Sequence, residues 1–481
     1  MVESETAVTR EYSDPCNNLE STHQTLQRLH KTRKGTIKMP TQLTIDRIDK
    51  TFGVSSKELK TYVEREGVDN KFTEALNTSK IVVIHGSSKQ GKTSLWKHHT
   101  SPDKTLQLNC GTIENITALH TQILKKVGFT ISTHKVTNEV SPQVGAEFNF
   151  LGISAGAKFE GTHTKSTEHI NIDLNPTDAN DITDALLQVG FKGTFIIEDF
   201  HYLNTKTQKD FTKTLKTFYD TGHLDATFVI VGVWKEANRL EVYNGDLGSR
   251  ITTINVDEWT PDELTKVISR GEELLEISFE HTFKGELVHH CEGAVYLLQS
   301  ACRTACITHM NRQSTEDSEV TGDARLLISD KIREQSARYE HFIIDYAEDD
   351  RTQKHHIRKW VIAILVAYVR HFDNRNYVTR DELASALSLL HPNYPKLTKG
   401  TMISSLGRTL TSVAQRQNDI GITPPVLSYD ENARRLNVVD LGFMIWLRNT
   451  DLSDVDNALS LPAADGNIDL FIEYLGDVNG W

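Results

Sequence analysis

The chain has 481 residues, which at roughly 100–200 residues per domain predicts two to four domains and excludes a small disulfide scaffold. Its 38% apolar and 25% charged residues exclude a fibrous or wholly disordered chain, and its longest apolar run, residues 360–369, has about half of the ~20 residues that cross a bilayer. The polar N-terminus does not have the pattern of a secretory signal, and the five cysteines lack CxxC spacing. We therefore expect a cytoplasmic protein without a membrane partner.

The net charge of −12 is distributed unevenly along the chain. Residues 351–440 carry 13 Lys and Arg against 7 Asp and Glu, a local charge of +6, which leaves −18 for the rest. Residues 451–481 contain seven acidic and no basic residues, so we expect an acidic C-terminal tail there. An acidic body with one mildly basic module does not exclude nucleic acid as a partner.

Residues 1–50 are polar, and we expect an N-terminal extension there. Within residues 51–258, short apolar runs alternate with helical stretches, which is typical of an α/β domain with a mostly parallel sheet. The predicted fold class is therefore α/β, with helices on both faces of one mostly parallel sheet. The five predicted strands of this sheet are 81–85, 105–110, 194–199, 227–233 and 251–256.

Residues 144–174 lie between the second and third of these strands and alternate polar with apolar residues. This period of two, with four glycines, predicts a β-hairpin insert that projects from the sheet. Two interpretations of it stay open. It is either a surface hairpin without a function of its own, or an element that contacts a partner or senses a signal.

The chain becomes helical after the last of these strands. Thr260 and Pro261 have the residue types of an N-cap and a first helical position, and the helical pattern continues to residue 346. We therefore expect a helical lid domain over residues 259–346.

Residues 350–450 have the element order of a winged-helix domain. The patterns predict helices over 355–372, 378–390 and 399–417, followed by two strands around a polar turn over 425–440. The first of these helices is apolar nearly all round, so we expect most of it to be core.

The most specific motif is GSSKQGKT, residues 86–93, which fits G-x-x-x-x-G-K-[ST] between a predicted strand and a helical run. In such a loop, backbone N–H groups and a helix N-terminus bind phosphate, and glycines allow the close approach. We expect Lys92 to contact the β- and γ-phosphates and the Thr93 hydroxyl to bind Mg²⁺. The expected nucleotide contacts are Gly86, Ser87, Ser88, Lys89, Gln90, Gly91, Lys92, Thr93 and Ser94.

The predicted strand 194–199 ends in two adjacent acids, Glu198 and Asp199. A P-loop enzyme needs two carboxylates at a neighbouring strand end, one in the Mg²⁺ shell and one to orient or activate water. The register assigns Glu198 to the metal and Asp199 to the water, and the reverse assignment stays open. Because Asp199 is one methylene shorter than the usual glutamate base, we expect a slow or regulated hydrolase.

With these residues the chain resembles the AAA+-like branch of P-loop ATPases that contains the STAND signalling ATPases, the archaeal-type ATPases and the origin-recognition initiators. The segment YVEREGVDNKFTEAL resembles the family segment that packs near the adenine, with Tyr62, Val63 and Arg65 at the matching positions. The segment GDLGSRITTINV resembles the element before the last strand. This likeness implies that Arg250 stabilises charge, either on the chain's own nucleotide or on a neighbour's. CEGAVYLLQ is similar to the family's GxPxxLQ segment, with Val295 in place of proline.

The resemblance extends to GFMIWLRN, which is similar to the end of the winged helix in archaeal-type ATPases. The polar sensor residue of the family is not matched, because Val233 and Trp234 follow the strand where it is expected. ATP and Mg²⁺ are the cofactors that the resemblance implies.

Three functions stay open. The first is a regulatory ATPase whose conformation or self-association controls a separately encoded effector or sensor, as in prokaryotic antiviral defence or signalling. The second is a DNA-binding ATPase similar to initiators or transposition helpers, and the third is a nucleotide-binding pseudo-ATPase scaffold. The basic residues expected to meet DNA in the second case are Lys399, Arg408, Arg416, Arg434 and Arg435.

Overall fold

The computed structural model describes residues 42–53, 60–133, 146–150, 170–311, 319–348, 356–372, 375–391 and 399–459. The N-terminal extension before residue 42, much of the 144–174 insert and the tail beyond residue 459 lie outside these residues. Within the described ranges, none of the helices has the length and apolar character needed to span a membrane.

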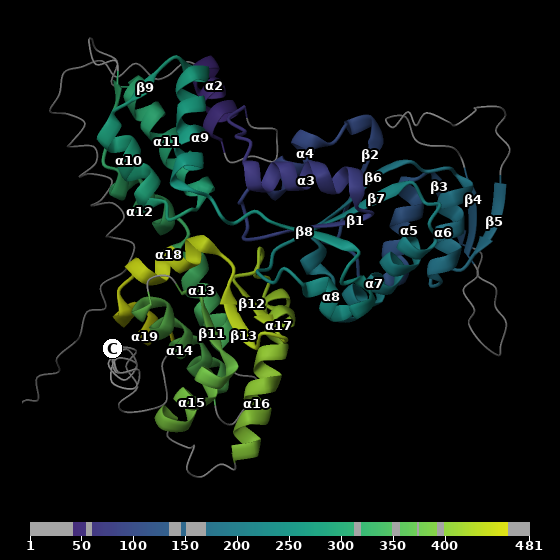
Figure 1. The fold of residues 1–481 in the computed structure, drawn as a ribbon. Coiled ribbons are helices and arrows are strands. Elements are labelled where there is room, and N and C mark those ends of the chain that lie inside the picture. The colour runs from purple at the N-terminus through teal and green to yellow at the C-terminus, as the bar shows by residue number, and fades with distance from the viewer. Residues whose placement is uncertain are drawn as a thin grey trace, which may run out of the picture.

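A five-stranded parallel sheet forms the centre of the first domain, in the order β2-β6-β7-β1-β8 (Figure 1). All five predicted strands are present within one residue of their predicted ends, which confirms the α/β fold class. Because the strands are parallel, their carboxyl ends meet at one edge of the sheet. The strands are β1 (Ile81–His85), β2 (Thr105–Asn109), β6 (Gly193–Glu198), β7 (Ala226–Gly232) and β8 (Ile251–Asn255).

Helices cover both faces of this sheet because alternate strand residues enter two separate apolar cores. Val82 and Ile84 pack on the side of α3 (Glu66–Thr78) and α4 (Lys92–His99). Ile81 and other residues of the opposite face pack with the remaining helices. Those helices are α5 (Ile116–Lys126), α6 (Ala179–Gln188), α7 (Thr205–Asp220) and α8 (Arg239–Tyr243), with short 3₁₀ turns η1 (Pro102–Lys104), η2 (Phe200–Tyr202) and η3 (Gly245–Leu247).

The predicted insert contributes to a second, antiparallel sheet of three strands, β3-β4-β5. Strands β4 (Ala146–Phe150) and β5 (Ile170–Leu174) pair as the hairpin prediction requires, and β3 (Phe129–Thr133) adds the third strand. Figure 1 shows this sheet beside α5 and α6, at the end of the domain away from the helical part.

The helical part begins as predicted with α9 (Pro261–Leu275), whose N-cap is Thr260. The Thr260 hydroxyl accepts from the Glu263 N–H at 3.2 Å, and the Glu263 carboxylate accepts from the Thr260 N–H at 2.9 Å, which forms a capping box. The other elements of this part are β9 (Ser278–Phe279), α10 (His281–His290), α11 (Val295–Asn311), β10 (Glu319–Val320) and α12 (Ala324–Arg333).

One further helix of this part, α2 (Gln42–Phe52), comes from the segment predicted as a polar extension up to residue 50. Ile48 and Phe52 are fully buried against α9 and α11, and Arg303 pairs with Asp49 at 2.6 Å. The predicted boundary is therefore too late, since residues 42–52 form an amphipathic helix whose apolar side enters the helical core.

The C-terminal part contains the predicted helices and the two predicted strands. Strand β11, which was not predicted, precedes the second helix and completes a three-stranded antiparallel sheet, β11-β13-β12. Helix α14 is buried along its whole apolar run, as expected for a core helix. The predicted helix 399–417 is divided in two at Ser412, which has non-helical dihedral angles. The elements are α14 (Ile357–His371), β11 (Tyr377–Thr379), α15 (Arg380–Leu390), α16 (Lys399–Thr411), α17 (Val413–Asp419), β12 (Leu427–Asp430), β13 (Arg435–Val438) and α18 (Leu441–Asn449).

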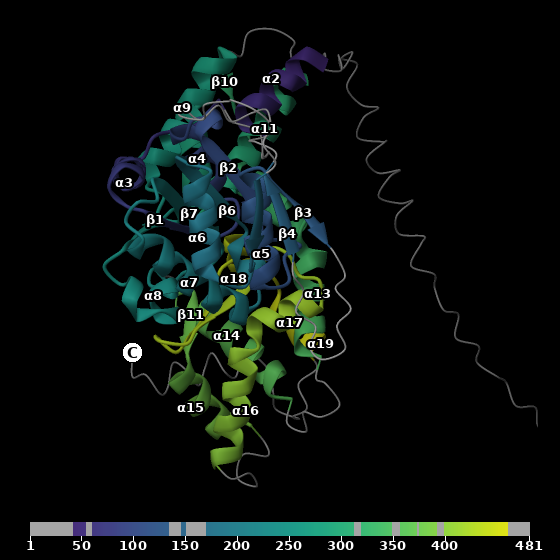
Figure 2. The ribbon, with the colours of Figure 1, turned by 90° about the vertical axis from the view of Figure 1, so that its right-hand side faces the viewer.

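Two more helices pack with the C-terminal part, although the sequence predicts other assignments for them. Helix α13 (Ser336–Ala347) falls in the predicted lid, yet Tyr339 packs against Phe443 of α18 with ring centroids 5.3 Å apart. Helix α19 (Leu452–Leu459) falls in the predicted acidic tail, yet Val455 is buried in the same apolar cluster. In both views, α15 and α16 lie at the end of this part that is farthest from the helical part (Figures 1 and 2).

Candidate functional site

The loop between β1 and α4 has the backbone of an anion-binding turn. Gly86 has φ +143° and Gly91 has φ +94°, angles that L side chains rarely adopt. A Cβ on Gly86 would also lie 2.7 Å from Oδ1 of Asp257, so both backbone angle and space require glycine there. Gly91 directly precedes α4, so the helix N-terminus joins the loop at this point.

Lys92, the first residue of α4, carries the cation of this loop. Its Nζ donates to the carbonyl oxygens of Gly86 at 3.0 Å and Ser87 at 2.5 Å. The surrounding protein atoms desolvate the ammonium group and lower the pKa of Lys92 to about 8. Both acceptors are uncharged, so this desolvated cation fits a bound anion such as a phosphate.

The two predicted acids lie at the end of β6, and β7 separates that strand from β1. The acids were expected on the strand next to β1, and this expectation is wrong by one strand. Side chains of α4 nevertheless contact Glu198. Thr93 Oγ1 donates to Glu198 Oε1 at 2.9 Å, and Trp96 Nε1 donates to the same oxygen at 2.5 Å. Burial raises the pKa of Glu198. A hydroxyl and a carboxylate oxygen side by side are the hard ligands that Mg²⁺ prefers, so the Thr93 and Glu198 pair fits the predicted metal.

Asp199 is held in the left-handed region at φ +59° directly after the strand. Its Oδ2 accepts from Asn109 Nδ2 at 2.9 Å. Sequence reasoning assigned no role to Asn109, although it ends β2, the strand next to β6, and so belongs to the same sheet edge. A prediction that β2 and β6 are neighbours in the sheet would have identified Asn109, because their ends would then lie side by side.

The residues after β7 and β8 brace the loop from the side. Asp257 accepts from the Ser87 N–H at 2.5 Å, and Lys235 Nζ donates to Asp257 at 2.5 Å and to Ser87 Oγ at 2.9 Å. Neither residue was predicted. Their signal is again positional, because each follows the carboxyl end of a strand that neighbours β1.

The predicted sensor position holds no polar side chain. Val233 lines the cavity, and Trp234 is fully buried and packs edge-on against Phe200. The nearby His201 accepts from the Val233 N–H through Nδ1 at 3.2 Å. Burial lowers the pKa of His201 to about 3, so the imidazole stays neutral at physiological pH.

Tyr62 and Arg65, predicted from the family segment, line the other end of the same cavity. The Arg65 guanidinium lies 4.2 Å from the Trp259 ring centroid and donates to the Val256 carbonyl at 2.9 Å. Asp69 accepts from the Arg65 N–H at 2.7 Å and from the Tyr62 hydroxyl. These contacts fix the segment against the sheet domain.

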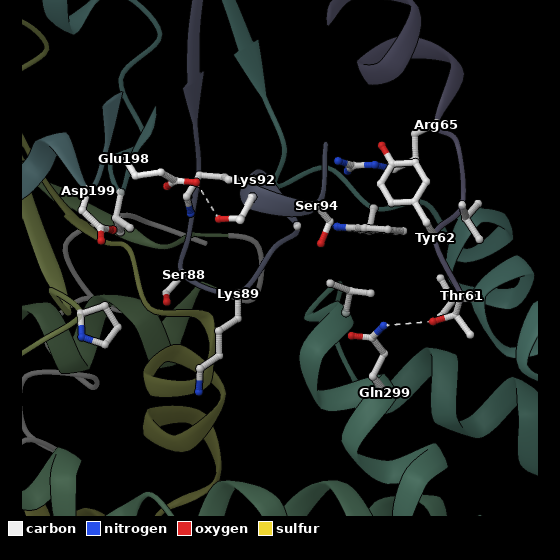
Figure 3. A pocket seen from close by; sticks show the side chains of 18 of the residues that line it. Thr61, Tyr62, Arg65, Ser88, Lys89, Lys92, Ser94, Glu198, Asp199 and Gln299 are labelled. Carbon is white, nitrogen blue, oxygen red and sulfur yellow. Dashed lines mark hydrogen bonds between the residues drawn. The ribbon is translucent and has the colours of Figure 1, made fainter. Parts of the chain in front are cut away.

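A cavity of about 440 Å³ runs between these two ends. Figure 3 shows Asp199, Glu198 and Lys92 at one end, and Tyr62, Thr61 and Gln299 at the other. Its walls come from three parts of the chain, since Val267, Val295 and Gln299 belong to the helical part and Pro424 precedes β12. The P-loop residues that line it are Ser88, Lys89, Gly91, Lys92, Thr93 and Ser94.

Two predicted P-loop contacts have side chains engaged elsewhere. Gln90 Nε2 donates to the Gly293 carbonyl at 2.9 Å, and its Oε1 accepts from the Val295 N–H at 3.2 Å. Ser87 Oγ bonds the Lys235 and Asp257 pair. The side chain of Gln90 therefore ties the P-loop to the start of α11.

Arg250 does not reach the cavity. It immediately precedes β8, so it lies at the amino ends of the parallel strands, opposite the edge that bears the P-loop. Its Nη1 bonds Asp220 at 2.6 Å, and the guanidinium lies over Tyr219. The prediction that Arg250 stabilises charge on the chain's own nucleotide is therefore wrong. The alternative, that it stabilises charge on the nucleotide of a neighbouring chain, stays a prediction.

The five residues predicted to contact DNA differ in whether their side chains are free to reach a partner. Arg408 on α16 is exposed, and so are Arg434 in the turn before β13 and Arg435, the first residue of β13. Arg416 instead donates to the carbonyls of Asp345 and Glu348, which fastens α17 to the end of α13. Lys399 begins α16, and the structure does not describe its side chain.

The parallel sheet, with its phosphate-type loop between β1 and α4, gives the first domain the P-loop NTPase fold. Neither a protein-family model nor a curated protein sequence matches the chain. Among solved structures, a Walker-type ATPase of Pyrococcus abyssi is 14% identical, with 80% of this chain and 96% of that chain covered and a TM-score of 0.45. Cdc6p from Pyrobaculum aerophilum is 11% identical, with 89% and 96% covered and a TM-score of 0.33. The Orc1 protein of Aeropyrum pernix, solved in complex with DNA, is 13% identical, with 88% and 96% covered and a TM-score of 0.38.

Proposed function

We propose that the chain is a regulatory ATPase, in which ATP and Mg²⁺ set the arrangement of three parts around one cavity. The observation that carries the proposal is the lining of that cavity by the P-loop, by Val295 and Gln299 of α11, and by Pro424 of the C-terminal part. A ligand that contacts all three parts stabilises the arrangement that it binds most tightly. The choice of ATP follows the family resemblance of the motifs.

The chemistry of the site supports slow hydrolysis. Lys92 would bind the phosphates, and Thr93 and Glu198 would hold the Mg²⁺, which when bound neutralises phosphate charge. Asp199 would accept a proton from the attacking water. One oxygen of Asp199 already accepts from Asn109, and the side chain is shorter than glutamate, so we expect Asp199 to act weakly.

Two substitutions test this site. Lys92→Ala should abolish binding of Mg²⁺–ATP, because it removes the cation of the phosphate loop. Asp199→Asn should preserve binding and lower phosphate release by about a hundredfold, because the amide cannot accept the proton. Equilibrium binding and phosphate release are measured on the same preparations. A wild-type chain that binds ATP but releases no phosphate would support the pseudo-ATPase scaffold instead.

We further propose that nucleotide occupancy controls a separately encoded effector or sensor, as in antiviral defence or signalling, through a change in conformation or self-association. The mass in solution and the pattern of limited proteolysis should then differ between the nucleotide-free chain and the chain with a slowly hydrolysed ATP analogue. If both measurements stay the same at saturating analogue, the chain is not a switch.

DNA binding by the C-terminal part is a second candidate function. It is favoured by the exposure of Arg408, Arg434 and Arg435 within the region of charge +6. The double variant Arg434→Glu with Arg435→Glu should weaken binding to duplex DNA and flatten its salt dependence, because two phosphate contacts are lost. The control is Arg325→Glu, at an arginine of α12 that is also exposed. No binding by the wild type at low salt rejects this function.

A further inference from the structure

The end of the cavity opposite the phosphate loop combines apolar walls with the side chains of Thr61, Tyr62 and Arg65 and the amide of Gln299. Val295 and Gln299 are one turn apart on α11, so both face the same side of the helix and both line the cavity. Val63, Val267 and Trp259 supply the other apolar surface. A flat, largely apolar ligand group fits between the apolar walls. The Tyr62 hydroxyl and the Arg65 guanidinium already donate to Asp69 and to the Val256 carbonyl, so we consider the Gln299 amide as the group that would contact the edge of such a ligand.

Two hydrogen bonds fix which way the Gln299 amide is turned. The Thr61 hydroxyl donates to the backbone carbonyl of Thr51 at 2.7 Å, so its single proton is committed there. The lone pairs of Thr61 Oγ1 therefore accept, and Gln299 Nε2 donates to them at 3.5 Å. The amide nitrogen must face Thr61, because the opposite orientation would place two acceptor oxygens against each other.

This orientation leaves the amide oxygen for a ligand. Figure 3 shows the Gln299 oxygen turned away from Thr61, toward the middle of the cavity. Within the described part of the chain, this oxygen makes no hydrogen bond, whereas Nε2 retains a second proton beside it. The edge of Gln299 therefore offers an acceptor next to a donor, in a fixed order.

We propose that Gln299 is a specificity-determining residue that selects a 6-amino purine through its amide oxygen. The exocyclic amino group of adenine donates where the Gln299 oxygen accepts, and the adjacent ring nitrogen accepts where Nε2 donates. Hypoxanthine and guanine carry an oxygen at the same position, which would face the Gln299 oxygen as a second acceptor. Thr61 acts as a positioning residue, because it prevents the amide from turning over to suit these bases.

This inference rests on the proposed nucleotide site, and its test uses the full chain with Mg²⁺ and two diphosphates, ADP and IDP. Their bases differ at position 6, where an amino group is replaced by an oxygen, and at the adjacent N1, which accepts in adenine and carries a proton in hypoxanthine. Calorimetry gives a Kd for each, and the readout is the ratio of the two values, because a variant with a weakened fold loses affinity for both alike. The wild type should prefer ADP by about tenfold or more. Gln299→Leu should bring the ratio close to one.

Thr61→Val provides the second, milder variant. It removes the hydroxyl that fixes the amide, so the ratio should fall toward one, whereas Thr61→Ser keeps the hydroxyl and should keep the wild-type ratio. Equal affinity of the wild type for ADP and IDP, or a preference that survives in Gln299→Leu, overturns the role of Gln299 and leaves the nucleotide site standing. If the wild type binds neither diphosphate, the proposed function fails, and the inference fails with it.

Discussion

At the scale of single residues, the charge state of Lys92 should make the affinity for nucleotide depend on pH. Its pKa in the free protein is lowered to about 8 by desolvation, and a bound phosphate would raise that pKa by stabilising the ammonium form. Above pH 8 the free protein has lost this proton, so binding must take one up. Affinity is therefore greatest below pH 8 and falls as the pH rises through it.

We expect the Kd for Mg²⁺–ADP to rise by up to about tenfold between pH 8 and pH 9, the limit for uptake of one proton. Calorimetry in two buffers of different ionisation enthalpy measures this uptake directly. Lys92→Arg is the control, because its guanidinium stays charged over the range and any remaining affinity should not vary with pH. A Kd that is constant from pH 7 to 9 in the wild type contradicts the assignment.

At the level of single residues, the sequence predicted those whose role depends on local spacing. The P-loop residues and the Glu198 and Asp199 pair were found because each motif lies within a few residues of one strand end. Asn109, Lys235 and Asp257 were missed because their roles depend on which strands are neighbours, and that order is set by the packing of the whole sheet.

Among the elements, α2 packs against α9 so closely that a single methyl group tests the contact. Phe52 lies over Gly271 of α9, and a Cβ on Gly271 would come within 1.9 Å of the ring. Gly271→Ala should destabilise the protein by about 1–3 kcal/mol, because the fully buried Phe52 has no room to move. The measurement is the midpoint of thermal unfolding, which should fall.

Gly285→Ala is the matched control for this helix contact. Gly285 lies in α10, is exposed, and would place its Cβ more than 4 Å from any other group. Alanine is the better helix former by up to about 1 kcal/mol, so the midpoint should rise or stay the same. An equal fall in both variants would show that helix propensity, and not the Phe52 contact, decides the result.

The sequence predicted where most helices and strands lie in the chain more reliably than which other elements they pack against. Strand ends and the N-cap at Thr260 followed from local residue types. The division of the 399–417 helix at Ser412 was missed because no Gly or Pro marks it. The packing of α2 and α13 was missed because apolar periodicity shows that a face is buried but not which neighbour covers it.

At the scale of the whole molecule, one short segment after β7 touches both the P-loop and the C-terminal part. Lys235 bonds Ser87 and Asp257 on one side. The next residue, Glu236, accepts from the Ser428 hydroxyl at 3.2 Å and the Asn437 amide at 3.5 Å, in β12 and β13. Since Pro424 also lines the cavity, the C-terminal part contacts the proposed nucleotide site at two points.

Glu236→Ala should loosen this junction, because it leaves the Ser428 and Asn437 side chains without their buried acceptor. We expect faster amide hydrogen exchange in peptides covering residues 233–238 and 425–430, by about tenfold, and a smaller protection of these peptides when ADP binds. Glu74→Ala, at an exposed position of α3, is the control and should leave both peptides unchanged. If exchange in Glu236→Ala matches the wild type with and without ADP, the Glu236 contacts do not couple the two parts. The coupling would then have to act through Pro424, and the substitution to test next would be Arg338→Ala, because Arg338 donates to the Pro424 carbonyl at 2.7 Å and holds that segment in place.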